Sequence, residues 1–254
     1  MEKATINGIE LAYTRQGNGT PLVLIHGYPL DHSIWDNVSP LLVGTFKLIL
    51  PDLRGFGESA SVGGSYSMAD LAADLAGLLD HLGFEQVALA GHSMGGYVAL
   101  AFARAYPARV RGLGLVSSQA LADAPDRKDG RYKTAAEVAE RGVGIVAEAM
   151  TPMLSVDVRV QAFVRDLINK QTSMGVVGAL KAMAERPDSA DLLPAFRFPV
   201  VLVHGDADAL IPLERAREVA SVVSQAKLFV LHGAGHMPMM EFPHETAEAL
   251  KHLA

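Results

Sequence analysis

Short apolar runs alternate with longer amphipathic segments along most of the chain. Runs bounded by turn-forming residues predict buried strands at Leu22–Ile25, Leu48–Leu50, Gln86–Ala90, Val110–Val116, Val200–Val203 and Lys227–Leu231. Apolar residues at helical spacing predict helices at Met68–Leu82 (behind Ser67 as N-cap), Gly96–Ala105, Leu213–Val223 and Ala247–Leu253. Near the N-terminus, Asn7-Gly8 joins two alternating segments and predicts a hairpin. Apolar strands that alternate with helices imply an α/β fold whose sheet is mostly parallel and covered on both faces.

This alternation stops between residues 120 and 193. Asp123–Gly130 is polar and rich in turn-forming residues, and helical patterns follow at Thr134–Met150, Val156–Lys170 and Thr172–Glu185. No strand pattern separates these helices. We therefore predict a helical cap of residues 120–193, inserted into a core of residues 1–119 and 194–254. The most apolar parts of the cap carry few charges, which favours an uncharged or weakly polar acyl group in the substrate.

The most informative motif is Gly91-His92-Ser93-Met94-Gly95, which lies between a predicted strand and a predicted helix. A serine on such a sharp turn has its hydroxyl pushed outward, near the positive N-terminus of the helix. Glycines two residues to either side are needed because a Cβ there would collide with the neighbouring strand and helix. We predict that Ser93 is a nucleophile.

Composition excludes several other classes of protein. The 254 residues carry a net charge of −6 and no basic stripe, which argues against binding nucleic acid. Cysteine is absent, so disulfides and thiolate metal sites are impossible. We find neither a signal peptide nor an apolar run long enough to span a membrane, and a cytoplasmic location is our expectation.

A serine nucleophile needs a base, usually a histidine oriented by a carboxylate. Of the nine histidines, His236 follows the last predicted strand, on the side where ligands bind open α/β sheets. His26, His92 and His204 adjoin glycines or the serine at strand ends, and we interpret them as structural. Asp206 and Asp208 are the candidate carboxylates. We favour Asp208, because Asp206 directly follows a glycine turn and suits local capping.

The reaction also needs donors for the developing oxyanion, typically backbone N–H groups. The amide of Met94 directly follows the nucleophile at the start of a helix. The amide of Tyr28 is the second candidate, because Gly27 permits a close approach and Pro29 restricts the residue before it. Such a site uses neither cofactor nor metal, and we expect none.

With these motifs in this order, the chain resembles the α/β-hydrolase superfamily. The matching segments, in that family's order, are His26–Pro29, Pro51–Ser59, Gly91–Gly96, Gly205–Asp208 with Pro212, and Gly235-His236. The resemblance implies an eight-stranded, mostly parallel sheet with a helical cap. It also implies the triad Ser93, Asp208 and His236, and a structural role for Arg54.

Within the superfamily, the chain is similar to serine carboxylesterases, 3-oxoadipate enol-lactonases and cofactor-free haloperoxidases. Ser93 excludes haloalkane dehalogenase and epoxide hydrolase chemistry, which use aspartate at that position. The haloperoxidases usually have a tryptophan after the first His-Gly and a Gly-Phe-Ser elbow, from which Tyr28 and His92 depart.

The leading hypothesis is a serine hydrolase that cleaves small carboxylic esters or lactones through an acyl-enzyme. The same triad also serves C–C bond hydrolysis or perhydrolysis. A hypothesis of another class is a ligand-sensing protein that keeps the triad but turns over slowly, since fold alone does not determine function. We expect a small-molecule substrate, and the oligomeric state is open.

The predicted substrate pocket draws on apolar residues of the cap and of the loop after the last strand. These are Met150, Met153, Leu154, Phe163, Met174 and Met237. The alternative for the cap residues is that they form the small core of the insertion itself, since methionine suits both environments.

Overall fold

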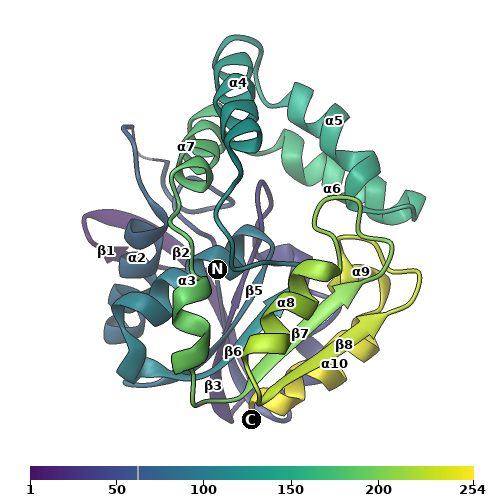
Figure 1. Ribbon diagram of the computed structural model, residues 1–254. Coiled ribbons are helices and arrows are strands. Elements are labelled where there is room, and N and C mark those ends of the chain that lie inside the picture. The colour runs from purple at the N-terminus through teal and green to yellow at the C-terminus, as the bar shows by residue number, and fades with distance from the viewer. Residues whose placement is uncertain (62) are drawn as a thin grey trace.

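The computed structural model describes residues 1–61 and 63–254, and within these ranges eight strands form one sheet (Figure 1). The strands are β1 (Glu2–Ile6), β2 (Ile9–Gln16), β3 (Thr20–Ile25), β4 (Phe46–Pro51), β5 (Val87–His92), β6 (Val110–Val116), β7 (Val200–Gly205) and β8 (Ala226–Leu231). Their order is β1-β2-β4-β3-β5-β6-β7-β8. The β1–β2 and β2–β4 pairs are antiparallel and all others are parallel, which confirms the predicted fold class.

The predicted hairpin joins β1 and β2. Asn7 and Gly8 both have positive φ, 51° and 78°. A two-residue turn with positive φ at both positions has the twist that the flanking strands require, and Asn-Gly tolerates it best.

Helices cover both faces of the sheet. The core helices are α1 (Ser39–Leu42), α2 (Met68–His81), α3 (Met94–Ala105), α8 (Glu214–Val222), α9 (Pro238–Glu241) and α10 (Pro243–Leu250), with short 3-10 turns at His32–Trp35, Pro107–Arg109, Ala190–Ala195 and Lys251–Leu253. Gly91 of β5 faces α3, whereas Gly114 of β6, paired with Ala90, lies against Leu250 of α10. Since successive strand residues point to opposite faces, α3 and α10 lie on opposite sides of the sheet.

Four further helices connect β6 to β7: α4 (Pro125–Arg141), α5 (Gly144–Leu154), α6 (Val158–Asn169) and α7 (Ser173–Ala184). Figure 1 shows this helical segment standing beyond the carboxyl ends of the central strands. None of the helices in residues 1–61 and 63–254 is both long and apolar enough to cross a bilayer.

The prediction of one helix over Thr134–Met150 is wrong. The chain forms two helices there, because Gly142 adopts φ 83° and ends α4. The polar stretch before Thr134 is also mostly helical, since α4 begins at Pro125, a residue well suited to the first helical position. This earlier start determines which side chains α4 turns inward.

Ser67 caps α2, as predicted. Its hydroxyl accepts the Asp70 N–H at 3.2 Å, and the Asp70 carboxylate accepts the Ser67 N–H at 2.8 Å. We expect Ser67→Ala to lower the free energy of unfolding by about 1 kcal/mol and the Tm by roughly 2–4 °C. Thermal unfolding followed by circular dichroism measures this, with the exposed loop variant Ser224→Ala as control. Equal Tm values for the two variants would contradict the capping role.

Candidate active site

Ser93 lies at the sharp junction between β5 and α3. Its backbone has φ 50° and ψ −114°, a strained combination for a residue with a side chain. Its N–H donates to the Val116 carbonyl at 2.9 Å, and its own carbonyl accepts the Ser118 hydroxyl at 2.7 Å. These bonds hold the turn in its strained form.

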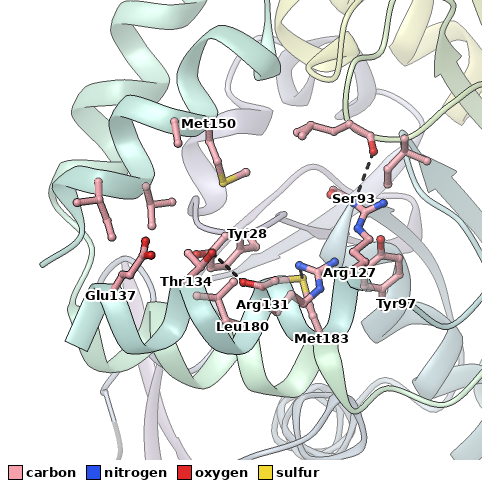
Figure 2. A pocket seen from close by; sticks show the side chains of 16 residues that line it. Tyr28, Ser93, Tyr97, Arg127, Arg131, Thr134, Glu137, Met150, Leu180 and Met183 are labelled. Carbon is pink, nitrogen blue, oxygen red and sulfur yellow. Dashed lines mark hydrogen bonds between the residues drawn. The ribbon is translucent and has the colours of Figure 1, made fainter. Parts of the chain in front are cut away.

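The two glycines of the motif have the role that the sequence predicts. A Cβ on Gly91 would come within 2.2 Å of the backbone of Gly95. A Cβ on Gly95 would lie 2.4 Å from the Ile25 carbonyl oxygen. Strand, turn and helix therefore pack backbone to backbone, and the Ser93 side chain faces an open cavity (Figure 2).

The structure brings His236 and Asp208 together. His236 Nδ1 lies 2.8 Å from Asp208 Oδ2, and both side chains are buried. The other carboxylate oxygen accepts the N–H groups of Leu210 and Ile211 at 2.8 and 3.0 Å. Burial raises the pKa of Asp208, but His236 and these amide donors outweigh it and hold that pKa below its usual value. An ionised Asp208 accepts the hydrogen on Nδ1, which leaves the lone pair on His236 Nε2.

The backbone of His236 is held from two sides. Its N–H donates to the Leu154 carbonyl at 3.0 Å, and its carbonyl accepts from His92 Nε2 at 2.8 Å. The rings of His92 and His236 lie 4.8 Å apart between centroids. Because His92 directly precedes Ser93, these contacts tie the histidine loop to the serine turn.

His26, His92 and His204 bond to backbone groups, as predicted. His26 Nε2 accepts the Leu53 N–H at 2.9 Å, and His204 Nε2 donates to the Ile211 carbonyl at 2.8 Å. Burial lowers the pKa of His92 well below its usual value, and a proton on the neighbouring His236 would lower it further. His92 therefore stays neutral and acts as a hydrogen-bond donor to the backbone.

Asp206 has the local capping role that the sequence suggests. Its carboxylate accepts the Gly233 N–H at 2.7 Å and pairs with His232 Nδ1 at 2.7 Å, at the exposed end of β8. It makes no hydrogen bond to His236 within the part of the chain that the structure describes.

The two amides expected to bind an oxyanion follow neighbouring parallel strands. Met94 is the first residue of α3, after β5, and Tyr28 follows β3. Gly27 is required here, because a Cβ on it would lie 2.4 Å from His92 Nδ1. The Tyr28–Pro29 peptide bond is cis, which the sequence analysis did not predict.

A cavity of about 410 Å³ opens from Ser93 and Tyr28 to the helical segment above the sheet. Met150 lines it (Figure 2). Leu154 and Met237 are buried outside its lining. The remaining pocket predictions are corrected: Met153, Phe163 and Met174 lie on the surface, with exposed fractions of 41%, 39% and 50%.

These misplacements share one cause. Helical spacing identifies an apolar face but not the partner that the face packs against. In α6, Val160, Val164 and Leu167 are buried, in a helix that packs against α5, and Phe163 lies at the exposed edge of that face.

Sequence reasoning missed the polar side of the cavity. Helix α4 contributes Arg127, Arg131, Thr134 and Glu137. These residues recur every three or four positions, which places them on one helical face. Thr134 and Glu137 lie in the predicted helix, but Arg127 lies in Asp123–Gly130, which was interpreted as a polar turn although α4 begins at Pro125.

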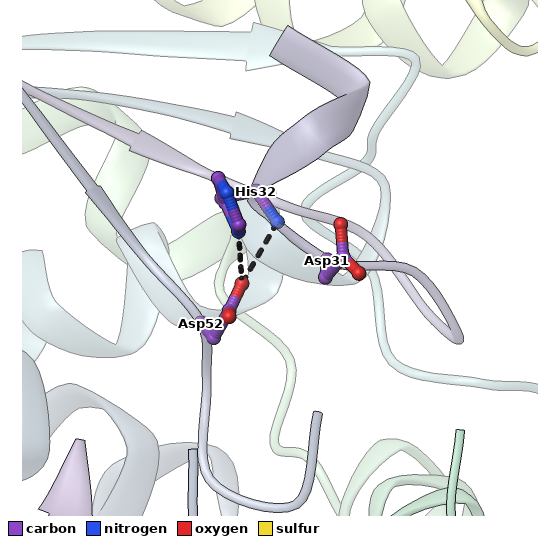
Figure 3. Close-up of side chains that lie close together, drawn as sticks. All are labelled: Asp31, His32 and Asp52. Atoms are coloured by element: carbon purple, nitrogen blue, oxygen red, sulfur yellow. Dashed lines mark hydrogen bonds and ion pairs between the residues drawn. The ribbon is translucent and has the colours of Figure 1, made fainter. Parts of the chain in front are cut away.

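Asp31, His32 and Asp52 gather at the ends of β3 and β4 (Figure 3). Asp52 Oδ1 accepts both the backbone N–H of His32 at 2.9 Å and its Nδ1–H at 2.7 Å. Asp52 Oδ2 accepts the Glu58 N–H, and Asp31 accepts the Ser33 N–H, each at 2.9 Å. These bonds fasten the two loops together, and we assign the cluster a structural role.

Comparison with known proteins identifies the class. Residues 20–243 match the family model for the alpha/beta hydrolase fold, and the chain belongs to that family. A dihydrolipoyllysine-residue acetyltransferase component of the acetoin cleaving system of Pseudomonas putida is 32% identical over 94% of this chain, which spans 65% of that protein's length. A non-heme haloperoxidase of Rhodococcus erythropolis is 30% identical over 91% of this chain and 90% of its own.

Among solved structures, the chain is similar to a thermophilic esterase from Thermogutta terrifontis, solved with malate bound. The two share 41% identity and a TM-score of 0.94, over 98% of this chain and 96% of the esterase. The family match and this likeness both show the alpha/beta hydrolase fold.

Proposed function

We propose that the protein is a serine hydrolase that cleaves small carboxylic esters, or lactones, through an acyl-enzyme. The observation that carries the proposal is the buried Asp208–His236 pair, tied through His92 to the strained turn of Ser93, which lines the cavity. A nucleophile, an oriented base and a substrate-sized space are, with the oxyanion donors, parts that acyl transfer needs.

In the proposed reaction, His236 Nε2 takes the proton of the Ser93 hydroxyl as Oγ attacks the acyl carbon. The amides of Tyr28 and Met94 hold the oxyanion of the tetrahedral intermediate. His236 then gives its proton to the departing alcohol, which leaves an ester on Ser93. A water molecule, deprotonated by His236, attacks that ester, and the acid departs as Ser93 Oγ regains a proton.

We propose that residues 120–193, with helices α4 to α7, act as the cap that shapes the substrate cavity. The support is that α4, α5 and α7 supply most of the cavity lining, while the core supplies Ser93 and Tyr28. Substrate selectivity then depends on cap side chains, whereas the chemistry depends on the core.

Hydrolysis of p-nitrophenyl esters from acetate to octanoate, together with simple lactones, tests the function. We expect turnover above about 1 s⁻¹ for the best short ester, as is usual for enzymes. A fluorophosphonate should block the activity: Ser93 Oγ displaces its fluoride, and the peptide that contains Ser93 gains the mass of the phosphonyl group in place of a hydrogen. Very slow turnover with tight product retention would instead support the ligand-sensing alternative.

The haloperoxidase relative supports a second candidate activity, perhydrolysis. In this reaction hydrogen peroxide replaces water in the attack on the acyl-enzyme, and a peracid departs. The same purified protein can be assayed for peracid formation from acetate and peroxide.

A further inference from the structure

The helix face that α4 turns toward the cavity is cationic. Arg127 and Arg131 are four residues apart and both line the cavity that contains Ser93. Glu137 also lines the cavity, but in Figure 2 it lies at the opposite side from Ser93. The part of the cavity wall nearest Ser93, formed by α4, therefore has an excess of positive charge.

Three guanidinium groups share one carboxylate beside this wall. The side chain of Asp123 is fully buried. Its carboxylate accepts hydrogen bonds from Arg131 Nε and, at 2.9 Å, from Arg186 Nη2, and it lies 3.6 Å from Arg127 Nε. The cluster has one negative charge against three positive charges. Burial raises the pKa of Asp123, but the arginines outweigh it and keep that pKa low, so the carboxylate stays charged.

The three arginines differ in whether they face the cavity. Arg186 bonds the carbonyls of Met183 and Leu121 besides Asp123, and stacks over the Tyr97 ring at 4.0 Å. Its side chain is buried in these contacts and does not line the cavity that contains Ser93.

Arg127 and Arg131 line the cavity and make weaker contacts. Besides Asp123, which also accepts from its Nη2 at 3.5 Å, Arg131 donates to the thioether of Met183 at 3.3 Å, a weak acceptor, and a guanidinium group has five N–H donors in all. Arg127 reaches the Leu210 carbonyl only at 3.5 Å. Both guanidinium groups line the cavity, so an anion within it would meet unfilled donors.

The hydroxyl of Tyr28 is a second, independent sign of a missing acceptor. Tyr28 is 6% exposed and lines the cavity, and its hydroxyl has no hydrogen-bond partner among residues 1–61 and 63–254. Buried hydroxyls without a partner are rare, because each forgoes its bonds to water. Burial raises the pKa of Tyr28 and the charge of Arg131 opposes that rise, so the group is a neutral donor near a cation.

We propose that the cavity takes an ester or lactone that carries a free carboxylate, bound by Arg127 and Arg131 and hydrogen-bonded by the Tyr28 hydroxyl. This inference rests on the proposed esterase function, and a carboxylate on the acyl side would revise the expectation of an uncharged or weakly polar acyl group. A planar carboxylate suits the paired donors of a guanidinium group. The carboxylate belongs either to the acyl part or to the alcohol part of the substrate. The experiment below distinguishes these two positions.

Two matched pairs of esters test the proposal. On the acyl side, mono-p-nitrophenyl glutarate is compared with its neutral methyl ester. On the alcohol side, the butyrate ester of 3-hydroxybenzoate is compared with that of methyl 3-hydroxybenzoate. We expect kcat/KM to favour the charged member of one pair at least tenfold, and that pair identifies the side that carries the carboxylate.

The variant Arg127→Gln should lower that charged-to-neutral ratio about tenfold, the usual effect of losing a hydrogen bond to a charged group. Its side chain is 42% exposed and weakly held, so the fold should tolerate the change. Arg159→Gln, in the same helical segment but 89% exposed and outside the cavity lining, is the matched control and should leave the ratio unchanged.

Tyr28→Phe removes the unpartnered hydroxyl but keeps the backbone amide. A hydroxyl with no partner contributes nothing to the fold, so the Tm should not fall, whereas the charged-to-neutral ratio should. A wild-type ratio near one for both pairs, or an unchanged ratio in Arg127→Gln, would overturn the inference while the esterase function stands. Absence of hydrolysis of all four esters would overturn the proposed function, and this inference with it.

Discussion

Ser93→Ala is expected to lower kcat for a short p-nitrophenyl ester roughly 10⁵–10⁶-fold, the loss typical of removing a serine nucleophile. Without Oγ no acyl-enzyme forms, and the remaining groups act only on water already present in the cavity. The serine turn is held by its backbone, through Val116 and Ser118, so removing the hydroxyl should leave the fold intact. Steady-state kinetics and a Tm measurement test both parts.

Ser117→Ala is the matched control for this variant. Ser117 directly follows the neighbouring strand β6 and also has a positive φ, 46°. Its hydroxyl is buried with no partner among the residues that the structure describes, so its removal should cost little. We expect kcat within about threefold of the wild type, a change equivalent to about 0.6 kcal/mol. Residual activity above one hundredth of wild type in Ser93→Ala would rule out Ser93 as the nucleophile.

The core was predictable because its signals are local. A fully buried parallel strand reads as a continuous apolar run, and β6 begins and ends at the residues that this pattern predicts, Val110 and Val116. The elbow was predictable for a related reason, since close backbone packing admits only glycine at positions 91 and 95. Parallel strands then bring distant loops to one edge, which is how Asp208 meets His236.

The cap was not predictable in the same way. Its helices pack against one another as well as against the core, so the direction in which a side chain points depends on tertiary contacts. Phe163 and Met174 are apolar like Met150, but they lie on the protein surface and not in the cavity lining. The start of α4 at Pro125 had the largest consequence, because it converts an apparent polar turn into a cationic wall of the cavity.

The second prediction with a large expected effect tests which of the two candidate carboxylates, Asp206 or Asp208, orients His236. Asp208→Asn should lower kcat roughly 10⁴-fold. The asparagine oxygen can keep the bonds to the Leu210 and Ile211 amides, which leaves its NH₂ group facing His236 Nδ1. An NH₂ group donates, so Nδ1 must accept and the ring hydrogen moves to Nε2, where the lone pair that takes the serine proton is lost. The fold is preserved, but the base has the wrong tautomer.

Asp206→Asn makes the same chemical change two residues earlier, where the carboxylate has only local contacts. Asp206 caps the Gly233 amide and pairs with His232, whose side chain is 86% exposed. We expect kcat within about threefold of wild type and little loss of stability, since exposed ion pairs are screened by solvent. Measuring kcat for both variants on one ester decides between the carboxylates: a loss of several thousandfold in Asp206→Asn, with near-normal kcat in Asp208→Asn, would reverse the assignment. Comparable losses in both would instead indicate that the loop as a whole, and not one carboxylate, positions His236.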